Sequence, residues 1–109
     1  MDLISRGYSV PATPEPLNRI RYVRVEYKNW RNPSDQGILD YDGSVSWSAV
    51  NNCWEMYIDY NSFLDVMIEK KSISFLDANK TPVSMQGFTY IVNDAEGDPW
   101  AGRIWIRKA

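Results

Sequence analysis

The sequence predicts an α+β, mostly β fold: about seven antiparallel strands forming a small sandwich or open barrel, one short packed helix and an extended N-terminal arm. Three observations lead to this prediction. Short segments of alternating apolar and polar residues recur between turn-forming clusters. A single segment, 62–70, has the spacing of an amphipathic helix. Three prolines fall close together near the N-terminus, at Pro11, Pro14 and Pro16.

The chain is expected to divide into an arm, residues 1–18, and one β-rich domain, residues 19–109. A length of 109 residues fits one small domain. The prolines of the arm fix φ and remove amide donors, which favours an extended or polyproline path over a helix or an inner strand. Whether the arm is loose or lies on a partner stays open at this point.

Strands are expected where β-branched and aromatic residues alternate with polar ones. The first of them, 20–28, reads IRYVRVEYK, and the fourth, 53–60, places Trp54, Met56 and Ile58 on the face expected to join the core. The seven predicted strands are 20–28, 38–41, 44–50, 53–60, 72–76, 88–92 and 100–107.

Turn-forming residues connect these strands. Asp42-Gly43 suits a type I′ turn because both residues tolerate positive φ, so the strands on either side of it are expected to form a hairpin. Asn51-Asn52 is expected to make a second tight turn. The segment 94–99 is expected to close a terminal hairpin between the last two strands.

The hydrophobic period changes between the fourth and fifth strands. Asn61 or Ser62 can cap a short helix that ends near Lys70, and Phe63 and Val66 share one of its faces. This helix is expected to cover one side of a sheet.

The segment GFTYIVNDAEGD, residues 87–98, with Ala101, Ile104 and Ile106 after it, resembles the last hairpin of cadherin-like and other immunoglobulin-like β-sandwich repeats. The resemblance covers about a fifth of the chain and implies an antiparallel edge hairpin. It implies nothing about binding or catalysis. Such domains have no helix where 62–70 lies, so the chain departs from them there.

The composition excludes several kinds of chemistry. The absence of histidine removes Ser-His-Asp and Cys-His catalysis and imidazole metal sites. The lone Cys53 cannot form an intramolecular disulfide and is expected to be a buried, inert thiol. The glycines are scattered and make no phosphate-binding loop. We therefore expect no enzyme, no cofactor and no metal.

Carboxylates are the acid-base groups that remain. Asp40 with Asp42, and Asp94 with Glu96 and Asp98, are spaced by two. Both sets fall at predicted turns, where Asp bonds to the local backbone. Neither glycoside hydrolysis nor Ca²⁺ binding is therefore expected from them.

No secretory leader or apolar spanning segment is evident in the sequence. The expected location is the cytoplasm. If the chain is phage-encoded, it is expected in the host cytoplasm or in a particle assembled there.

The net charge of −2 conceals an asymmetry along the chain. Residues 32–69 hold seven acidic residues and no Lys or Arg, whereas both flanking segments are net basic. Tyr and Trp are interleaved with these acids. Such a mixture suits an interface with a basic protein, because aromatic residues anchor interfaces and complementary charge speeds association. The alternative is that the aromatics build the core and the acids face water.

Two surfaces are candidates for partner contact. The acidic and aromatic one consists of Asp40, Tyr41, Asp42, Glu55, Tyr57 and Asp59. The second consists of Arg103, Trp105 and Arg107, which alternate along the last strand. Arg21 and Arg24 would join this second surface if the first and last strands were neighbours, but a pI near 5.0 argues against direct nucleic-acid binding.

The leading expectation is therefore a non-enzymatic protein-binding domain that engages a basic protein, including a nucleic-acid-binding protein or enzyme. An inhibitor, immunity or phage antidefence protein would be of this type, with carboxylates standing in for phosphates. One alternative is a phage, virion or other assembly subunit that uses its N-terminal arm. Another is a carbohydrate-binding module with exposed Trp and Tyr platforms. A homo-oligomer stays open, and no membrane contact is expected.

Overall fold

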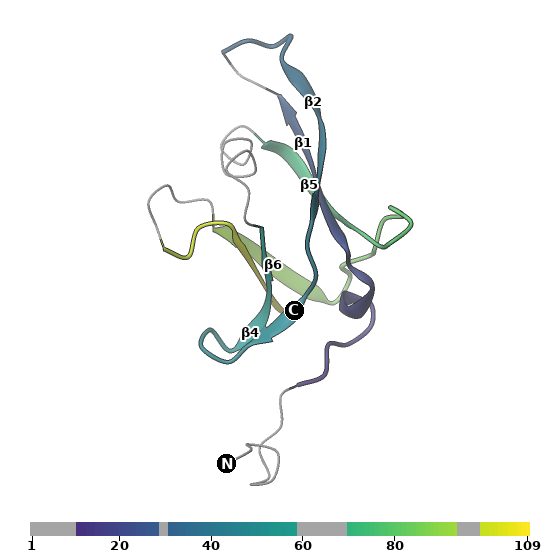
Figure 1. The fold of residues 1–109 in the computed structure, drawn as a ribbon, viewed down its shortest axis with the longest axis vertical. Coiled ribbons are helices and arrows are strands. Elements are labelled where there is room, and N and C mark those ends of the chain that lie inside the picture. Colours follow the sequence, from purple (N-terminus) through teal and green to yellow (C-terminus); the bar gives the residue numbers. More distant parts are fainter. Residues whose placement is uncertain (1–10, 29–30, 59–69, 94–98) are drawn as a thin grey trace, which may run out of the picture.

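A computed structural model of the chain describes residues 11–28, 31–58, 70–93 and 99–109. These residues form seven strands in two antiparallel sheets (Figure 1). Helical structure within them is confined to one 3₁₀ turn, Leu17–Arg19. The predicted antiparallel, mostly β fold of sandwich type is confirmed.

The two sheets have three and four strands. The three-stranded sheet has the order β2-β1-β5, and the four-stranded sheet the order β3-β4-β7-β6. The bounds of the strands are β1 Tyr22–Lys28, β2 Gln36–Asp42, β3 Ser46–Ser48, β4 Cys53–Tyr57, β5 Lys70–Leu76, β6 Phe88–Asn93 and β7 Arg103–Lys108. Each corresponds to a predicted strand.

The core forms where the inward faces of both sheets meet. Val23 and Val25 of β1, and Ile104 and Ile106 of β7, are fully buried, as their alternation along the strands predicts. Burial of such side chains stabilises each by about 1.5–3 kcal/mol relative to exposure. Twelve buried side chains make up the cluster: Leu17, Ile20, Val23, Val25, Tyr41, Trp54, Met56, Ile58, Phe75, Val83, Ile104 and Ile106.

The predicted hairpin at Asp42-Gly43 is wrong. The Gly43 N–H donates to the Arg21 carbonyl oxygen at 2.9 Å, so the chain continues along β1 before it crosses to the other sheet. A Cβ on Gly43 would lie 2.7 Å from Cδ1 of Ile58 and 2.9 Å from Cε of Met56. The glycine is therefore needed for close packing of this crossover on the core, and it has no positive φ.

Two other predicted hairpin pairings are confirmed, although residues 94–98 of the second predicted turn lie outside the described residues. β3 pairs with β4 through a turn in which Asn52 has a φ of 53°, a conformation that Asn tolerates. β6 pairs with β7 in an antiparallel hairpin, and β6 is the end strand of its sheet. The edge hairpin implied by the immunoglobulin-like resemblance is thus present.

Two expectations concern parts of the chain that the structure describes incompletely. The predicted helix falls within 59–69, outside the described residues, apart from Lys70, which begins β5. Residues 1–10 of the arm also lie outside them. Leu17, which the sequence places in the arm, is fully buried in the core, so core packing extends into the segment predicted as arm.

Candidate functional site

The six residues of the predicted acidic and aromatic surface are distributed over two sheets. Three of them lie on β2 of the three-stranded sheet, and two lie on β4 of the four-stranded sheet. Tyr41 is buried in the core, 7% exposed, and Asp42 is exposed at the end of β2. Asp59 lies outside the described residues. The structure therefore does not bring all of these residues together on one surface, although Asp42 and Tyr57 line the same groove.

Asp40 is held in an ion pair within the three-stranded sheet. It stands opposite Arg24 in the β1–β2 register, and Nε and Nη2 of Arg24 donate to its two carboxylate oxygens at 2.7 and 3.0 Å. Nζ of Lys80 lies 3.3 Å from Oδ2. The hydrogen bonds from Arg24 hold the pKa of the Asp40 carboxyl below its ordinary value of 3.8. Its charge is thus compensated within the chain.

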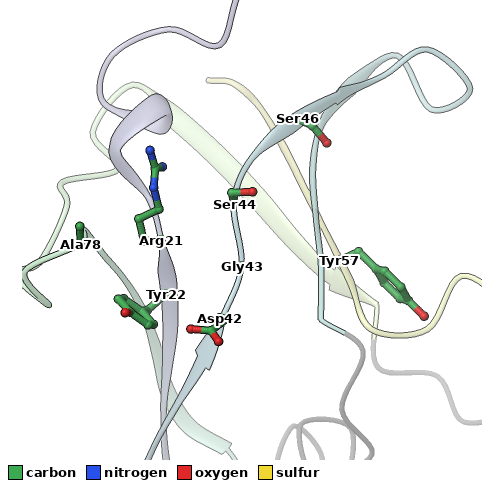
Figure 2. A pocket seen from close by; sticks show the side chains of 8 residues that line it. All are labelled: Arg21, Tyr22, Asp42, Gly43, Ser44, Ser46, Tyr57 and Ala78. Carbon is green, nitrogen blue, oxygen red and sulfur yellow. The ribbon is translucent and has the colours of Figure 1, made fainter.

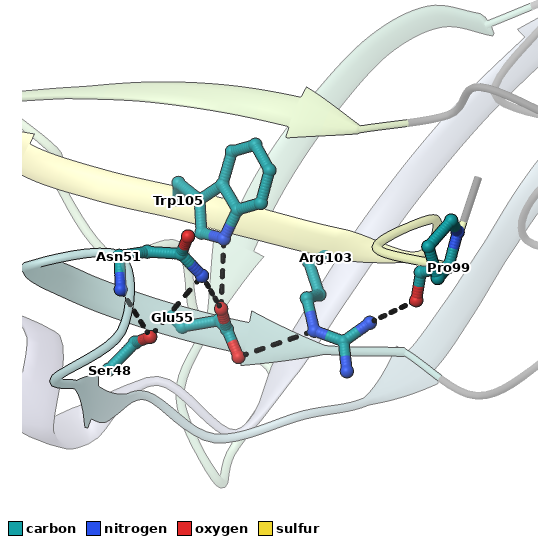
Figure 3. Close-up of polar contacts among 6 residues, drawn as sticks. All are labelled: Ser48, Asn51, Glu55, Pro99, Arg103 and Trp105. Atoms are coloured by element: carbon teal, nitrogen blue, oxygen red, sulfur yellow. Dashed lines mark hydrogen bonds and ion pairs between the residues drawn. The ribbon is translucent and has the colours of Figure 1, made fainter.

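Glu55 is the centre of a polar network on the outer face of the four-stranded sheet (Figure 3). Trp105, directly opposite on β7, donates its indole N–H to Oε2 at 2.8 Å. Nδ2 of Asn51 donates to the same oxygen at 3.2 Å, and Nε of Arg103 lies 3.5 Å from Oε1. The Glu55 side chain is 18% exposed, so it offers little charge to a partner.

Arg103 lies between two aromatic rings on the same face. Its guanidinium carbon is 4.5 Å from the ring centroid of Tyr57 and 4.8 Å from that of Trp100. Its Nη1 also donates to the Pro99 carbonyl oxygen at 3.2 Å, as Figure 3 shows. Tyr57 is 50% and Trp100 39% exposed. We call Tyr57, Arg103 and Trp100 the aromatic–arginine stack.

The predicted surface of Arg103, Trp105 and Arg107 lies on one face of β7, but it is shared with the acidic one. The β4–β7 register places Glu55 opposite Trp105 and Tyr57 opposite Arg103. Nη2 of Arg107 donates to the carbonyl oxygen of a residue in the β3–β4 turn at 3.1 Å. The first and last strands are in different sheets, so the condition for adding Arg21 and Arg24 is not met.

Trp100 is a candidate contact residue that the sequence did not single out. The sequence predicts a strand over 100–107. In such a strand Trp100 would share a face with Ile104 and Ile106 and would therefore be expected to join the core. In the structure it precedes the strand, in a turn, and folds back over Arg103. The sequence feature that could have indicated this contact is the spacing of three residues between Trp100, directly after a predicted turn, and Arg103.

A polar groove lies where the chain crosses between the sheets (Figure 2). The crossover residues Asp42, Gly43 and Ser44 form its middle, with Arg21, Tyr22 and Ala78 on one side and Ser46 and Tyr57 on the other, and its volume is about 640 Å³. That volume is within the range of small-molecule sites, about 300–1,000 Å³. Tyr57 belongs both to this groove and to the aromatic–arginine stack.

Residues 32–69, which we call the cation-free segment because they include no Lys or Arg, are therefore neutralised in part by residues of the two flanking segments. Arg24 comes from the basic segment before it, and Lys80 and Arg103 come from the one after it. The sequence pattern that favoured an acidic surface instead reflects pairing between distant strands at Asp40 and Glu55. This corrects the expectation that these two acids present an accessible charged surface.

The described residues contain no cluster of three or more His, Cys, Asp or Glu side chains that could hold a metal ion. Asp94, Glu96 and Asp98 lie outside the described residues. Cys53 is buried, as expected, and burial raises the pKa of its thiol. A raised pKa disfavours the thiolate, so this group is not set up as a nucleophile.

No protein family, curated protein or solved structure matches this chain. Among the residues described, no helix has the length and apolar character needed to cross a membrane.

Proposed function

We propose that this chain is a non-enzymatic protein-binding domain whose contact surface is the aromatic–arginine stack on the outer face of the four-stranded sheet. One observation carries the proposal: Tyr57 and Trp100 flank the Arg103 guanidinium at 4.5 and 4.8 Å while both rings remain substantially exposed. Tyr, Trp and Arg are the residue types that contribute most to binding energy at protein interfaces.

The fixed geometry of the stack supports this role. Arg103 is positioned by Glu55 and by the Pro99 carbonyl group, and its own side chain is 21% exposed. Side chains that are already ordered lose less conformational entropy when a partner binds. An exposed Tyr and Trp held in this way can bury area at a low entropic cost.

The chemistry of the partner follows from which charges remain accessible. Asp42 is exposed and lines the groove, and it supports the expected basic partner. Asp40 and Glu55 do not, because Arg24, Lys80 and Arg103 compensate them. Binding at the stack is therefore expected to depend on burial of the rings, with only a modest loss of affinity as salt rises.

The test is affinity capture from a lysate with matched bait proteins. Trp100→Ala and Tyr57→Ala remove one ring each, and Val50→Ser alters an 80% exposed residue in the β3–β4 turn as the control. A specific partner should be retained by wild type and by the control and be lost with both ring variants, provided that circular dichroism shows folded baits. Recovery of the same proteins by all four baits would refute the proposal.

Salt separates this proposal from an inhibitor that imitates nucleic acid. A contact made by carboxylates should weaken steeply between low and high salt, whereas a contact at the stack should not. Steep salt dependence together with sensitivity to Asp42→Asn, but not to Trp100→Ala, would transfer the function to the acidic residues.

The groove favours carbohydrate binding as a second candidate function. Tyr22 and Tyr57 offer rings, Ser44 and Ser46 offer hydroxyls, and the open, polar lining suits a ligand rich in hydroxyl groups. Titration of labelled protein with a panel of polysaccharides, followed by NMR, would test this. Shifts confined to the amides of 42–46 would support it, and an unchanged spectrum with every polysaccharide would exclude it.

A further inference from the structure

β6 is an end strand of the four-stranded sheet, and its outer side has no strand partner among the described residues. β6 pairs with β7 on one side, and no strand of the described chain pairs with it on the other. Its six residues, FTYIVN, include no charged residue, no proline and no glycine. Exposed end strands of this composition readily accept another strand.

The other three end strands carry features that discourage pairing. β3 has only three residues. β2 contains Gly37 and two acids, Asp40 and Asp42. β5 begins with two lysines, and its end is occupied by residues 82–83, because Pro82 bridges to Leu76 and the following N–H donates to the Phe75 carbonyl oxygen at 2.8 Å. Short length and charged residues are common protections of a sheet edge, and β6 has neither.

The backbone of β6 presents a defined set of groups on this side. The Ala109 N–H donates to the Gly87 carbonyl oxygen at 2.9 Å, one position beyond the Phe88–Lys108 pair. Because hydrogen-bonded positions alternate in antiparallel pairs, Phe88, Tyr90 and Val92 direct their N–H and C=O groups away from β7. The Phe88 N–H donates to the Met85 carbonyl oxygen at 3.0 Å. The donors turned toward the unpaired side are thus those of Tyr90 and Val92.

We propose that two copies of this chain pair through β6, antiparallel, about a two-fold axis at Ile91. In this register the N–H and C=O groups of Tyr90 exchange hydrogen bonds with those of Val92 of the second copy, and the reverse. The register needs only the donors of Tyr90 and Val92. Centring the axis on Tyr90 instead would require the Phe88 N–H, which Met85 already occupies.

The exposed side chains of β6 fit the same register. Ile91 is 59% exposed, and at the axis it lies directly against Ile91 of the second copy. Thr89 then faces Asn93 of the second copy, so the pairs formed by residues 89–93 contain no charged side chain. We expect the partner strand to be β6 of a second copy. An uncharged strand with these donors and acceptors is complementary to an identical strand that runs antiparallel to it. The result is one continuous sheet of eight strands.

The mass of the protein in solution tests the pairing. Wild type should show, at high concentration, twice the mass of the 12.6-kDa chain in sedimentation or light scattering. Ile91→Lys places two like charges opposite each other and should give the mass of one chain. Ile38→Lys, on the end strand β2 and 57% exposed, is the matched control and should keep the wild-type mass. A wild type that stays a single chain at every concentration, or an Ile91→Lys variant that keeps the doubled mass, would overturn the proposal.

Disulfide cross-linking tests the register. At a two-fold axis the Cβ atoms of an opposed pair lie about 4.5–5.5 Å apart, so Ile91→Cys should form a covalent dimer on mild oxidation. The two Thr89 residues would be offset by about 13 Å along the strands, so Thr89→Cys should not form a covalent dimer. Wild type is the background control, because its Cys53 is 1% exposed. Cross-linking through Thr89→Cys but not Ile91→Cys would refute the register. Neither outcome bears on the aromatic–arginine stack, which this pairing does not use.

Discussion

Glu55 on β4 and Trp105 on β7 stand directly opposite each other, and the indole N–H of Trp105 donates to the Glu55 carboxylate at 2.8 Å. This bond connects the cation-free segment to the basic C-terminal strand. It also places Glu55 within 3.5 Å of Nε of Arg103, which the two aromatic rings flank. Glu55 and Tyr57 of the predicted acidic surface therefore form one network with Arg103 and Trp105 of the second predicted surface.

Removing the Glu55 carboxylate should destabilise the domain. Glu55→Ala leaves the indole N–H of Trp105 without its acceptor and the Arg103 guanidinium without its ion-pair partner, which is expected to cost about 1–3 kcal/mol. Urea unfolding followed by fluorescence measures the change. Glu26→Ala, an exposed acid on β1, is the control and should change stability by less than about 0.5 kcal/mol. Equal effects of the two substitutions would contradict the assigned network.

The Asp40 ion pair should make stability depend on pH in the acid range. The folded state holds the pKa of Asp40 below 3.8, so folding favours the ionised carboxylate. Its contribution is fully present well above pH 3.8 and is lost as pH falls through the lower, folded-state pKa. The difference in unfolding free energy between wild type and Asp40→Asn should therefore shrink as the pH is lowered below 3.8. A difference that is constant with pH would show that the ion pair is not the cause.

Two glycines with nearly the same backbone conformation should respond differently to a methyl group. Gly102 has a φ of +87° and Gly87 a φ of +89°, so alanine strains both by about 1–2 kcal/mol. A Cβ at Gly102 would also lie 2.7 Å from the Ile58 carbonyl oxygen, whereas nothing lies within 4 Å at Gly87. Chemical unfolding should show a clearly larger loss of stability for Gly102→Ala. Equal losses would mean that the backbone near Ile58 shifts to accept the methyl group.

The Cys53 thiol should be unreactive in the folded protein. It is 1% exposed, and burial raises its pKa, so little thiolate is available to attack a reagent. Labelling with a chromogenic disulfide reagent at neutral pH should be at least about 100-fold slower than in urea, because it requires local or global opening. Rapid labelling under native conditions would show that β4 opens readily at this position.

The strands could be predicted because their signals are local. Val23 and Val25 occupy alternate positions of β1, and Ile104 and Ile106 occupy alternate positions of β7; all four are buried. Asn52, with its positive φ, supports its turn without help from distant residues. Such patterns follow from the two-residue period of a strand and from the steric limits of the backbone.

The predictions that failed depended on which strands pair. Asp42-Gly43 is compatible with a hairpin turn, but pairing of Asp42 with Tyr22 on β1 holds the chain extended and sends it to the other sheet. Asp40 and Glu55 were predicted to lie on one surface. Strand pairing also places them in separate sheets.

The sequence by itself therefore determined where the strands lie, which of their faces are apolar, and that catalysis by histidine is absent. The tertiary structure decided which charged side chains form ion pairs and hydrogen bonds with one another. Asp40 and Arg24 are sixteen residues apart, and Glu55 and Trp105 are fifty apart. Hydrogen bonds and ion pairs act over a few ångströms. Only the pairing of β1 with β2 and of β4 with β7 brings these groups within that range, and it compensates two of the acids in residues 32–69, Asp40 and Glu55.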